Sequence, residues 1–418
     1  MRTAKHLHLV AGVAALGMLL AACSAPENTQ RPEGEETAAA GGEEGAGDEI
    51  PETPSEPVDL TIHDVGGVLK LVQGAIEDFA EENPDVIASV TFETGASPDL
   101  VGSLKPQIDT GNLQIDMVLT GNDALSAGLG EDLWIPIAEE YGDRLGNMEN
   151  YIPQAADMSE LAQGHGVLLS WTPGGPLLSY NPEQLPEADV PSTPEALLEW
   201  AAANPGKFGY ARPANSGPGR TWLQGLPYML GDEDPRDPEN GWDNTWAFLK
   251  ELDQYVTTYP TGTGQVITNM SDGTWALTPI TMGWDIEPRA DGRAPNTLTV
   301  AEFDDYTFIS DSHFAVVPQG QTPDKISAIL LLLNDLLTPE QNAKLYDNGY
   351  HYPGPSIEGA TLDLAPEDTQ AVIEEFSRDW YDEAIETHDA QTQLDAAAIV
   401  TAFDIWDREV GAGKFEAN

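Results

Sequence analysis

The sequence predicts an α/β protein built from two domains, and three observations support this. Strand-like and helix-like segments alternate near the start of the folded part. The chain has 418 residues, more than a single hydrophobic core usually serves. Hydrophobic residues make up 40% of the chain, with 10 Trp, 12 Tyr and 10 Phe, so it can bury a core despite its charge.

Residues 1–22 predict a secretory signal peptide. Two basic residues precede an apolar stretch that is too short for a transmembrane helix, and small residues follow it. Cys23 is the only cysteine, so no internal disulfide can form, and with the preceding Leu-Ala-Ala it resembles the lipobox of bacterial lipoproteins. This resemblance implies a lipidated Cys23 that anchors the chain on the extracytoplasmic face of the cell membrane. The alternative is a freely secreted protein whose cysteine is incidental.

Residues 23–57 predict an acidic disordered tether, because they are rich in Glu, Gly, Ala, Pro and Thr. The whole chain carries a net charge of −53, most of it after this tether. Such acidity excludes a basic surface for nucleic acid or anionic lipid, so we expect no nucleic-acid partner. The acids lack ligand-like spacing, so we expect no metal and assign them to solubility in high salt, where screening weakens repulsion.

The folded part begins with alternating elements. Residues 58–65 and 87–93 predict strands, 68–82 and 97–110 predict helices, and 115–119 predicts a third strand. This order is typical of a parallel sheet with crossover helices. Ligands of such sheets bind beyond the carboxyl ends of the strands. The candidate residues there are Asp64, Gly66, Thr120, Asn122 and Asp123, whose alternative role is turn formation.

Three later helices have the same predicted start. Thr193, Thr322 and Thr338 are each followed by Pro and an acid, which places a hydroxyl at the N-cap and an acid in the first turn. The apolar run 329–333 is far too short to span a membrane and reads as a buried helix face.

Several phrases in order resemble the type II extracellular solute-binding proteins that feed ABC importers, near branches that bind polyamines or thiamine. These phrases are Glu81-Glu82-Asn83-Pro84, Ile115-Asp116-Met117-Val118, Tyr180-Asn181 within 167–185, residues 193–200, residues 270–284 and residues 314–343. The resemblance implies a two-lobe, periplasmic-binding-protein-like type II fold (Venus flytrap). Each lobe would be a mostly parallel sheet flanked by helices and joined to the other by hinge crossovers.

The resemblance also implies the lobe boundaries. Lobe 1 would comprise 58–178 and 312–350, and lobe 2 would comprise 179–311 and 351–418, with C-terminal helices packing across the lobes. A monomer would capture a small solute between the lobes and present it to the transmembrane subunits of an ABC permease.

An enzyme is not expected, because the Gly-x-Ser-x-Gly, His-Glu-x-x-His and Walker signatures are missing. We also expect no cofactor. A secreted hydrolase and a surface protein that binds no small solute remain the alternatives.

Further candidate residues come from aromatic and glycine-rich segments. Trp171, Trp284, Asp285 and Tyr352 could line the cleft, although Trp171 could equally be a core residue. Residues 212–222 form a small-residue loop that enters a helix, where Asn215, Ser216, Gly217 and Arg220 could hold an anionic group. In the alternative reading, Arg212 and Arg220 pair with surplus acids.

Among the possible ligand classes, the sequence favours a cation and leaves two others open. Aromatic residues and acids favour a polyamine or thiamine-like cation. Arg220 and its loop favour an anionic or zwitterionic solute, and a sugar stacked on Trp284 is also compatible.

Overall fold

A computed structural model describes residues 50–414 of the chain. The expected signal peptide, Cys23 and most of the expected tether therefore lie outside the described residues. The end of the tether differs from the expectation, because residues 51–55 contact the folded body. Arg144 donates to the carbonyl oxygens of Pro51 and Glu52, each at 2.9 Å. The Ser55 backbone N–H and Oγ donate to Asp324 at 2.9 and 2.6 Å. Ordered contacts thus begin before residue 58.

The strands of the described residues form two sheets. The larger has the order β2-β1-β3-β8-β4-β9, with β10 beside β8, and the smaller has the order β6-β5-β7. The strands are β1 (Val58–Asp64), β2 (Ile87–Thr94), β3 (Met117–Thr120), β4 (Gly166–Gly175), β5 (Leu177–Tyr180), β6 (Leu277–Ile280), β7 (Thr299–Ala301), β8 (Phe308–Val316), β9 (Gly354–Pro355) and β10 (Ala390–Gln391).

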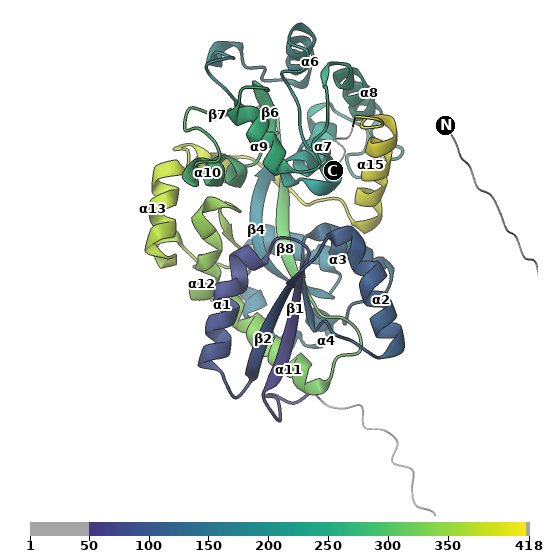
Figure 1. Cartoon of the computed structure of the whole chain (residues 1–418), viewed down its shortest axis with the longest axis vertical. Helices are drawn as coiled ribbons and strands as arrows, with labels where there is room; N and C mark the ends of the chain where they lie inside the picture. The colour runs from purple at the N-terminus through teal and green to yellow at the C-terminus, as the bar shows by residue number, and fades with distance from the viewer. Residues whose placement is uncertain (1–49, 415–418) are drawn as a thin grey trace, which may run out of the picture. The chain divides into compact units, whose positions relative to one another are not determined.

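Helices flank both sheets, as Figure 1 shows. The α-helices are α1 (Leu69–Glu82), α2 (Leu100–Thr110), α3 (Asn122–Gly130), α4 (Ile137–Glu140), α5 (Pro153–Ser159), α6 (Pro194–Ala203), α7 (Gly217–Met229), α8 (Asp243–Leu252), α9 (Thr263–Ser271), α10 (Met282–Ala290), α11 (Pro323–Leu336), α12 (Pro339–Asn342), α13 (Glu367–Phe376), α14 (Tyr381–Thr387) and α15 (Ala396–Glu409). The 3-10 helices used below are η1 (Ser97–Asp99) and η8 (Ala343–Gly349).

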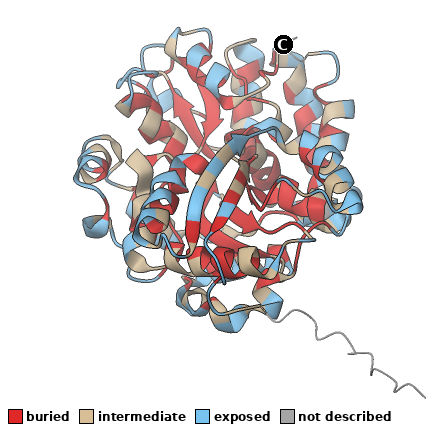
Figure 2. Ribbon diagram, turned by 60° about the horizontal axis from the view of Figure 1, so that its bottom comes forward, coloured by how far each residue is buried: buried red, intermediate tan, exposed pale blue. Residues whose placement is uncertain are grey.

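The alternation expected near the start of the fold is confirmed. β1 pairs in parallel with β2 on one side and with β3 on the other. α1 places Val72, Ile76 and Phe79 against the core, at the spacing of one helix face. Figure 2 shows buried residues in the inner strands and on the inward faces of the helices, whereas the edge strand β2 is mostly exposed. The carboxyl ends of β1, β2 and β3 consequently meet at one edge, as the sequence predicts.

Two long strands connect the two sheets. β4 and β8 pair antiparallel from Gly166 opposite Val316 to Gly175 opposite Ile309, and they run side by side through the middle of the view in Figure 1. β5 follows β4 after the single residue Pro176 and pairs in the smaller sheet. The predicted crossover that leads into Tyr180-Asn181 is therefore confirmed.

The smaller sheet differs from the expectation of a mostly parallel sheet. β5 pairs antiparallel with both β6 and β7. Parallel pairing needs a crossover that returns each strand in the same direction, and the chain between these strands brings it back in the opposite one. Aromatic rings fill the core beside this sheet. The ring centroids of Trp222 and Phe303, which stack, are 5.7 Å apart, and those of Tyr210 and Tyr259 are 5.1 Å apart. Most large rings here serve packing.

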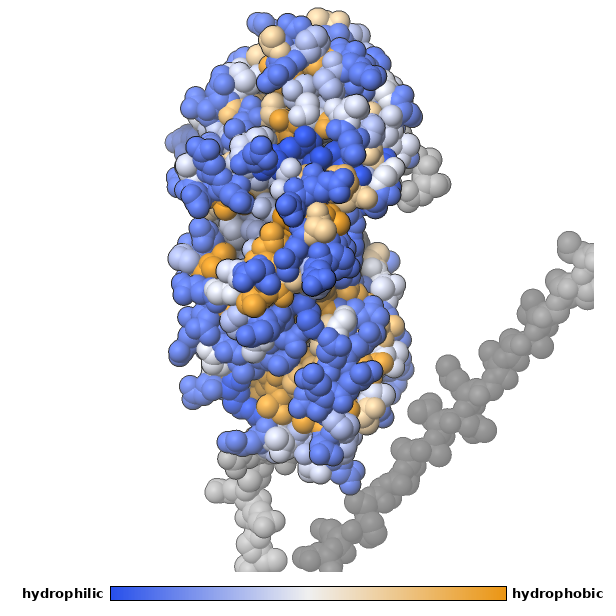
Figure 3. Space-filling view, turned by 90° about the vertical axis from the view of Figure 1, so that its left-hand side faces the viewer, coloured by the Kyte–Doolittle hydropathy of each residue, from blue (hydrophilic) through white to orange (hydrophobic). Residues whose placement is uncertain are grey.

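The predicted helix starts are confirmed in atomic detail. The hydroxyls of Thr193, Thr322 and Thr338 accept hydrogen bonds from the backbone N–H three residues later. The run at 329–333 lies in α11, where Ile329 and Leu333 are fully buried. Across residues 50–414, none of the helices has the length and apolar character that crossing a bilayer would require. Figure 3 shows a face covered mostly by hydrophilic residues, as the composition implies.

Candidate functional site

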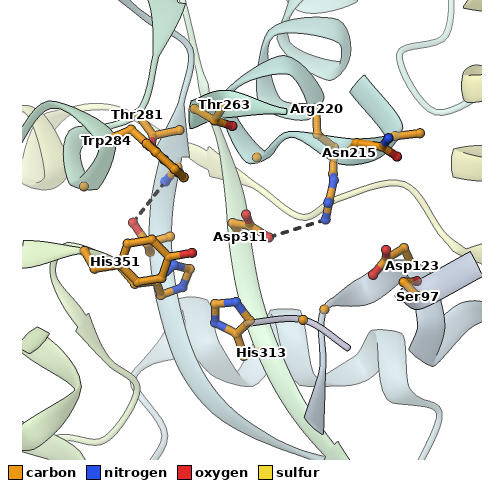
Figure 4. Close-up of a pocket in the computed structure, with 18 of the residues that line it drawn as sticks. Ser97, Asp123, Asn215, Arg220, Thr263, Thr281, Trp284, Asp311, His313 and His351 are labelled. Carbon is orange, nitrogen blue, oxygen red and sulfur yellow. Dashed lines mark hydrogen bonds and ion pairs between the residues drawn. The ribbon is translucent and has the colours of Figure 1, made fainter. Parts of the chain in front are cut away.

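A cavity of about 450 Å³ lies between elements of the two sheets. On the side of the larger sheet, the loops that follow β1 and β2 and the start of α3 line the cavity. On the side of the smaller sheet, the starts of α7, α9 and α10 line it. Asp311 and His313 of β8 and the segment after η8 form the rest of its wall (Figure 4). The lining residues are Val65, Gly66, Ala96, Ser97, Gly121, Asp123, Thr172, Gly174, Ala214, Asn215, Gly217, Arg220, Thr263, Thr281, Gly283, Trp284, Asp311, His313, Tyr350, His351 and Tyr352.

Several helices point their N-termini at this cavity. The N-cap residues of α3, α9 and α10 are Gly121, Gly262 and Thr281, and across the described chain none of them makes a side-chain cap hydrogen bond. The first amides of a helix lack intrahelical acceptors and carry partial positive charge. These helix starts therefore favour an acceptor or an anionic group inside the cavity.

Three charged side chains line the cavity. Arg220 extends from α7 toward Asp311 on β8, as Figure 4 shows, and its Nη1 lies 3.9 Å from Asp311 Oδ1. The Arg220 side chain is 11% exposed, and within residues 50–414 its Nε has no hydrogen-bond partner. Asp123 lies on the opposite wall, in the first turn of α3. A buried guanidinium with a spare donor beside two carboxylates can bind both acceptor and donor groups of a polar solute.

The Asp311 carboxylate is held from behind. Its Oδ1 accepts from Gln393 Nε2 at 2.7 Å and from the Ser312 backbone N–H at 3.0 Å. Gln393 is fully buried, and its neighbour Leu394 receives a hydrogen bond from Asn122 Nδ2 at 3.0 Å. The segment before α15 therefore fixes the orientation of a carboxylate at the cavity.

Two buried imidazoles form another wall. The rings of His313 and His351 have centroids 4.4 Å apart, and Ser170 Oγ lies 2.9 Å from His313 Nδ1. Burial is the main cause that lowers the pKa of His313, and burial together with His313 lowers the pKa of His351 well below its usual value. Both rings are neutral at pH 7 and add hydrogen-bonding atoms to the cavity without adding positive charge.

The aromatic wall of the cavity consists of Trp284 and Tyr350. Their ring centroids are 6.0 Å apart in an edge-to-face arrangement. Burial, reinforced by nearby carboxylates, raises the pKa of Tyr350 to about 12, so its hydroxyl stays protonated. The two rings offer a flat apolar surface beside the polar groups.

The family of this chain follows from its similarity to a known sequence model. The sequence model described as bacterial extracellular solute-binding protein matches residues 74–374. This chain belongs to that family. No curated protein sequence is similar enough to count as a relative.

Solved structures share the fold of this solute-binding protein at low sequence identity. A spermidine/putrescine ABC transporter substrate-binding protein from Streptococcus pneumoniae has a TM-score of 0.54 and 17% identity, with 83% of this chain and 99% of that chain covered. A periplasmic binding protein from Actinobacillus pleuropneumoniae with fructose 6-phosphate bound has a TM-score of 0.58 and 14% identity, with 85% of this chain and 99% of that chain covered. A periplasmic thiamin-binding protein has a TM-score of 0.58 and 14% identity, with 86% of this chain and 99% of that chain covered. These likenesses establish the two-lobe α/β fold.

The structure places seven of the thirteen predicted ligand-binding residues of this solute-binding protein in the cavity wall. They are Gly66, Asp123, Asn215, Gly217, Arg220, Trp284 and Tyr352. Gly66 also has a packing role, because a Cβ there would lie 2.7 Å from the Gly121 backbone nitrogen. The small-residue loop before α7 therefore does face the cleft.

Three predicted strand-end residues lie outside the cavity wall. Asp64 accepts hydrogen bonds from the N–H groups of Gly66, Val68 and Leu69, so it shapes the turn into α1. Thr120 is fully buried and donates to the Gly121 carbonyl oxygen at 2.9 Å. Asn122 is likewise fully buried and holds the segment before α15, as described above.

Three more predicted residues are used structurally. Trp171 is 2% exposed and donates to Ser310 Oγ at 3.1 Å, as a core residue would. Ser216 caps α7 by accepting from the Gly219 N–H at 3.1 Å. Asp285 receives hydrogen bonds from Arg289, Arg378 and Tyr381 and is not among the residues that line the cavity.

Sequence reasoning missed the two side chains of β8 in the cavity, Asp311 and His313. Both lie on a strand whose neighbours are buried, and no turn or motif marks them. Ser97 follows a strand end that the sequence does identify, and Tyr350 and His351 adjoin Tyr352. Across residues 50–414, no three His, Cys, Asp or Glu side chains gather as a metal site would require.

Proposed function

We propose that this protein captures a small solute in the cavity and presents it to the permease subunits of an ABC importer, without chemical turnover. The observation that carries the proposal is the shared lining of the cavity. Arg220 comes from the smaller sheet's side, yet a Cβ on Gly121 of the larger sheet's side would lie 3.8 Å from Arg220 Nη1. A solute that contacts both sides would stabilise a closed arrangement for the permease to recognise.

The lobes in this proposal are residues 58–178 with 312–350, and residues 179–311 with 351–418. β4 and β8 would be the hinge strands, because they pair in the larger sheet and lead to the smaller one. The C-terminal helix α15 supports the cross-lobe packing expected from the sequence, since it contacts α3 and follows the segment bound by Asn122.

We also propose that a lipid on Cys23 tethers this monomer to the outer face of the cell membrane. The support is the lipobox-like Leu-Ala-Ala-Cys sequence and the acidic segment that follows it. Metabolic labelling with a radioactive fatty acid tests this, and Cys23→Ala should abolish both the label and the membrane fraction of the protein.

The cavity supports a hydroxylated solute with one anionic group better than the polyamine or thiamine-like cation that the sequence favours. The spare donor of Arg220 and the starts of α9 and α10 suit an anionic group. Asp123 and Asp311 can accept hydrogen bonds from hydroxyls, and Trp284 offers a face for a sugar ring. A protein of the same fold has fructose 6-phosphate bound, which makes sugar phosphates the first compounds to test.

A thermal-shift screen tests the ligand class. Fructose 6-phosphate and related sugar phosphates should raise the Tm, because a ligand at one hundred times its Kd stabilises the folded state by about 2.7 kcal/mol. Arg220→Gln should weaken binding of the sugar phosphate by about 10- to 100-fold, since it removes a charge-assisted hydrogen bond. Arg408→Gln is the matched control, because Arg408 is 64% exposed and lies outside the cavity wall.

Other outcomes of the screen have equally clear meanings. Stabilisation by spermidine or thiamine alone would assign the cation instead. Turnover of a stabilising compound would support the alternative function, a secreted hydrolase. If no solute class stabilised the protein, solute capture would be contradicted. Binding to vesicles that hold the matching permease would then test delivery.

A further inference from the structure

The aromatic pair Trp284 and Tyr350 would ordinarily attract organic cations. Both rings line the cavity, as do Asp123 and Asp311. Aromatic faces beside carboxylates are the usual way in which proteins hold ammonium groups. The surroundings of the two rings change this expectation.

Each ring of the pair already holds a cation of the protein itself. Lys70 Nζ lies 4.0 Å from the centroid of the Tyr350 ring. The guanidinium carbon of Arg293 lies 5.7 Å from the centroid of the Trp284 ring. Both distances fall within the reach of cation–π attraction. A cationic solute on either ring would compete with a cation of the protein for that ring.

Glu287 anchors both of these cations. Its carboxylate forms an ion pair with Lys70, and its Oε2 lies 2.5 Å from Arg293 Nη2. The Glu287 side chain is 13% exposed, whereas those of Lys70 and Arg293 are 43% and 42% exposed. Asp347 also lies 4.0 Å from Lys70 Nζ, and Asp291 pairs with Arg293 at 2.5 Å. Glu287 follows Trp284 by three residues on α10 and therefore lies on nearly the same helix face. The network joins α1 to α10, which are elements from the two sides of the cavity.

We propose that Lys70 and Arg293, positioned by Glu287, make the cavity select against organic cations. The inference rests on the proposed function, because it concerns the choice of solute at the same cavity. Each ring already contacts a cation of the protein, so an added ammonium group gains little cation–π attraction there, whereas a neutral C–H surface can still pack on the rings.

A pair of probes with the same shape isolates the effect of charge. Choline and 3,3-dimethylbutan-1-ol differ by one positive charge, so the ratio of their Kd values measures the preference of the cavity for a cation. Wild type should bind choline no more tightly than its neutral analogue. The double variant Lys70→Met/Arg293→Met should shift the ratio toward choline by about tenfold, because it frees both rings for the ammonium group.

A control double variant separates this local effect from overall charge. Lys105→Met/Arg408→Met removes the same charge from residues that pair with Glu131 and Glu409 outside the cavity wall. It should change the ratio by less than about twofold. If the double variant is poorly folded, the single variant Lys70→Met replaces it in the test. It should shift the ratio toward choline by about threefold.

The outcomes separate this inference from the proposed function. An unchanged ratio in Lys70→Met/Arg293→Met, an equal shift in the control, or a strong choline preference in wild type would each overturn the inference. Failure of every solute in the thermal-shift screen would instead count against the proposed function. If a sugar phosphate binds but the ratio of the two Kd values does not change in the double variant, the proposed function is supported and the role of Lys70 and Arg293 is contradicted.

Discussion

Asp285 acts as a positioning residue for the start of α10. Its side chain is 2% exposed, and it pairs with Arg289 at 2.7 Å and Arg378 at 2.8 Å. Asp285→Asn should lower the free energy of unfolding by about 3 to 5 kcal/mol, because it leaves buried guanidinium groups without a charged partner. Urea denaturation measures this. Asp291→Asn is the control, since the Asp291 side chain is 40% exposed, and an equal loss in both would contradict the role of burial.

The paired imidazoles make a prediction about pH at the residue scale. Because burial lowers the pKa of His313 and His351, the unfolded chain binds protons more readily than the folded one below pH 6.5. Their contribution to stability is fully present above about pH 6.5 and falls as the pH decreases further. The Tm difference between wild type and His313→Asn/His351→Asn should therefore shrink from pH 7.5 to pH 5. His165→Asn, which alters a partly exposed histidine bonded to Gln163, should show no such trend.

Individual site residues were predictable only where the sequence marks a turn or a helix start. Glycines and strand ends led to Gly66 and Asp123, and the loop before α7 led to Arg220, all of which line the cavity. Asp285 lies outside the cavity wall although its neighbour Trp284 lines the cavity, because one position along a helix turns a side chain by about 100°. The position of Asp311 in the cavity could not be predicted from the sequence. It depends on the pairing of β8 with β3 and β4, which are far from β8 along the chain.

The capped starts of the helices give a prediction at the scale of elements. Ser216 caps α7, and its Oγ lies 2.8 Å from the hydroxyl of Thr263 at the start of α9. Ser216→Ala should cost about 1 kcal/mol of stability and also weaken binding of the solute, since both helix starts line the cavity. Thr193→Ala should cost a similar amount, because Thr193 caps α6 away from the cavity, but it should leave the solute Kd unchanged. Calorimetric titration of both variants decides; equal Kd values would remove Ser216 from any role at the site.

Elements were more predictable than their arrangement. Local chemistry sets a helix start such as the Thr-Pro-acid phrase, so the caps at Thr193, Thr322 and Thr338 followed from the sequence. The direction of β6 and β7 relative to β5 depends on long connections whose course no local pattern encodes. The contacts of residues 51–55 were missed for a related reason, because Arg144 and Asp324, which hold them, lie far along the chain.

At the scale of the whole molecule, the charge surplus predicts a dependence on salt. The chain has 71 acidic residues and 18 Lys and Arg, so most carboxylates have no basic partner to pair with. Several bases also serve more than one acid, as Arg293 does with Glu287 and Asp291. The unpaired carboxylates repel one another more strongly in the compact folded state than in the expanded chain. Raising NaCl from 0.1 to 1 M shortens the Debye length from about 10 to about 3 Å and should therefore raise the Tm. KCl should act equally if screening is the cause. A Tm that falls with salt would show that the ion pairs of the folded state outweigh the repulsion, and a response to one cation alone would indicate specific binding.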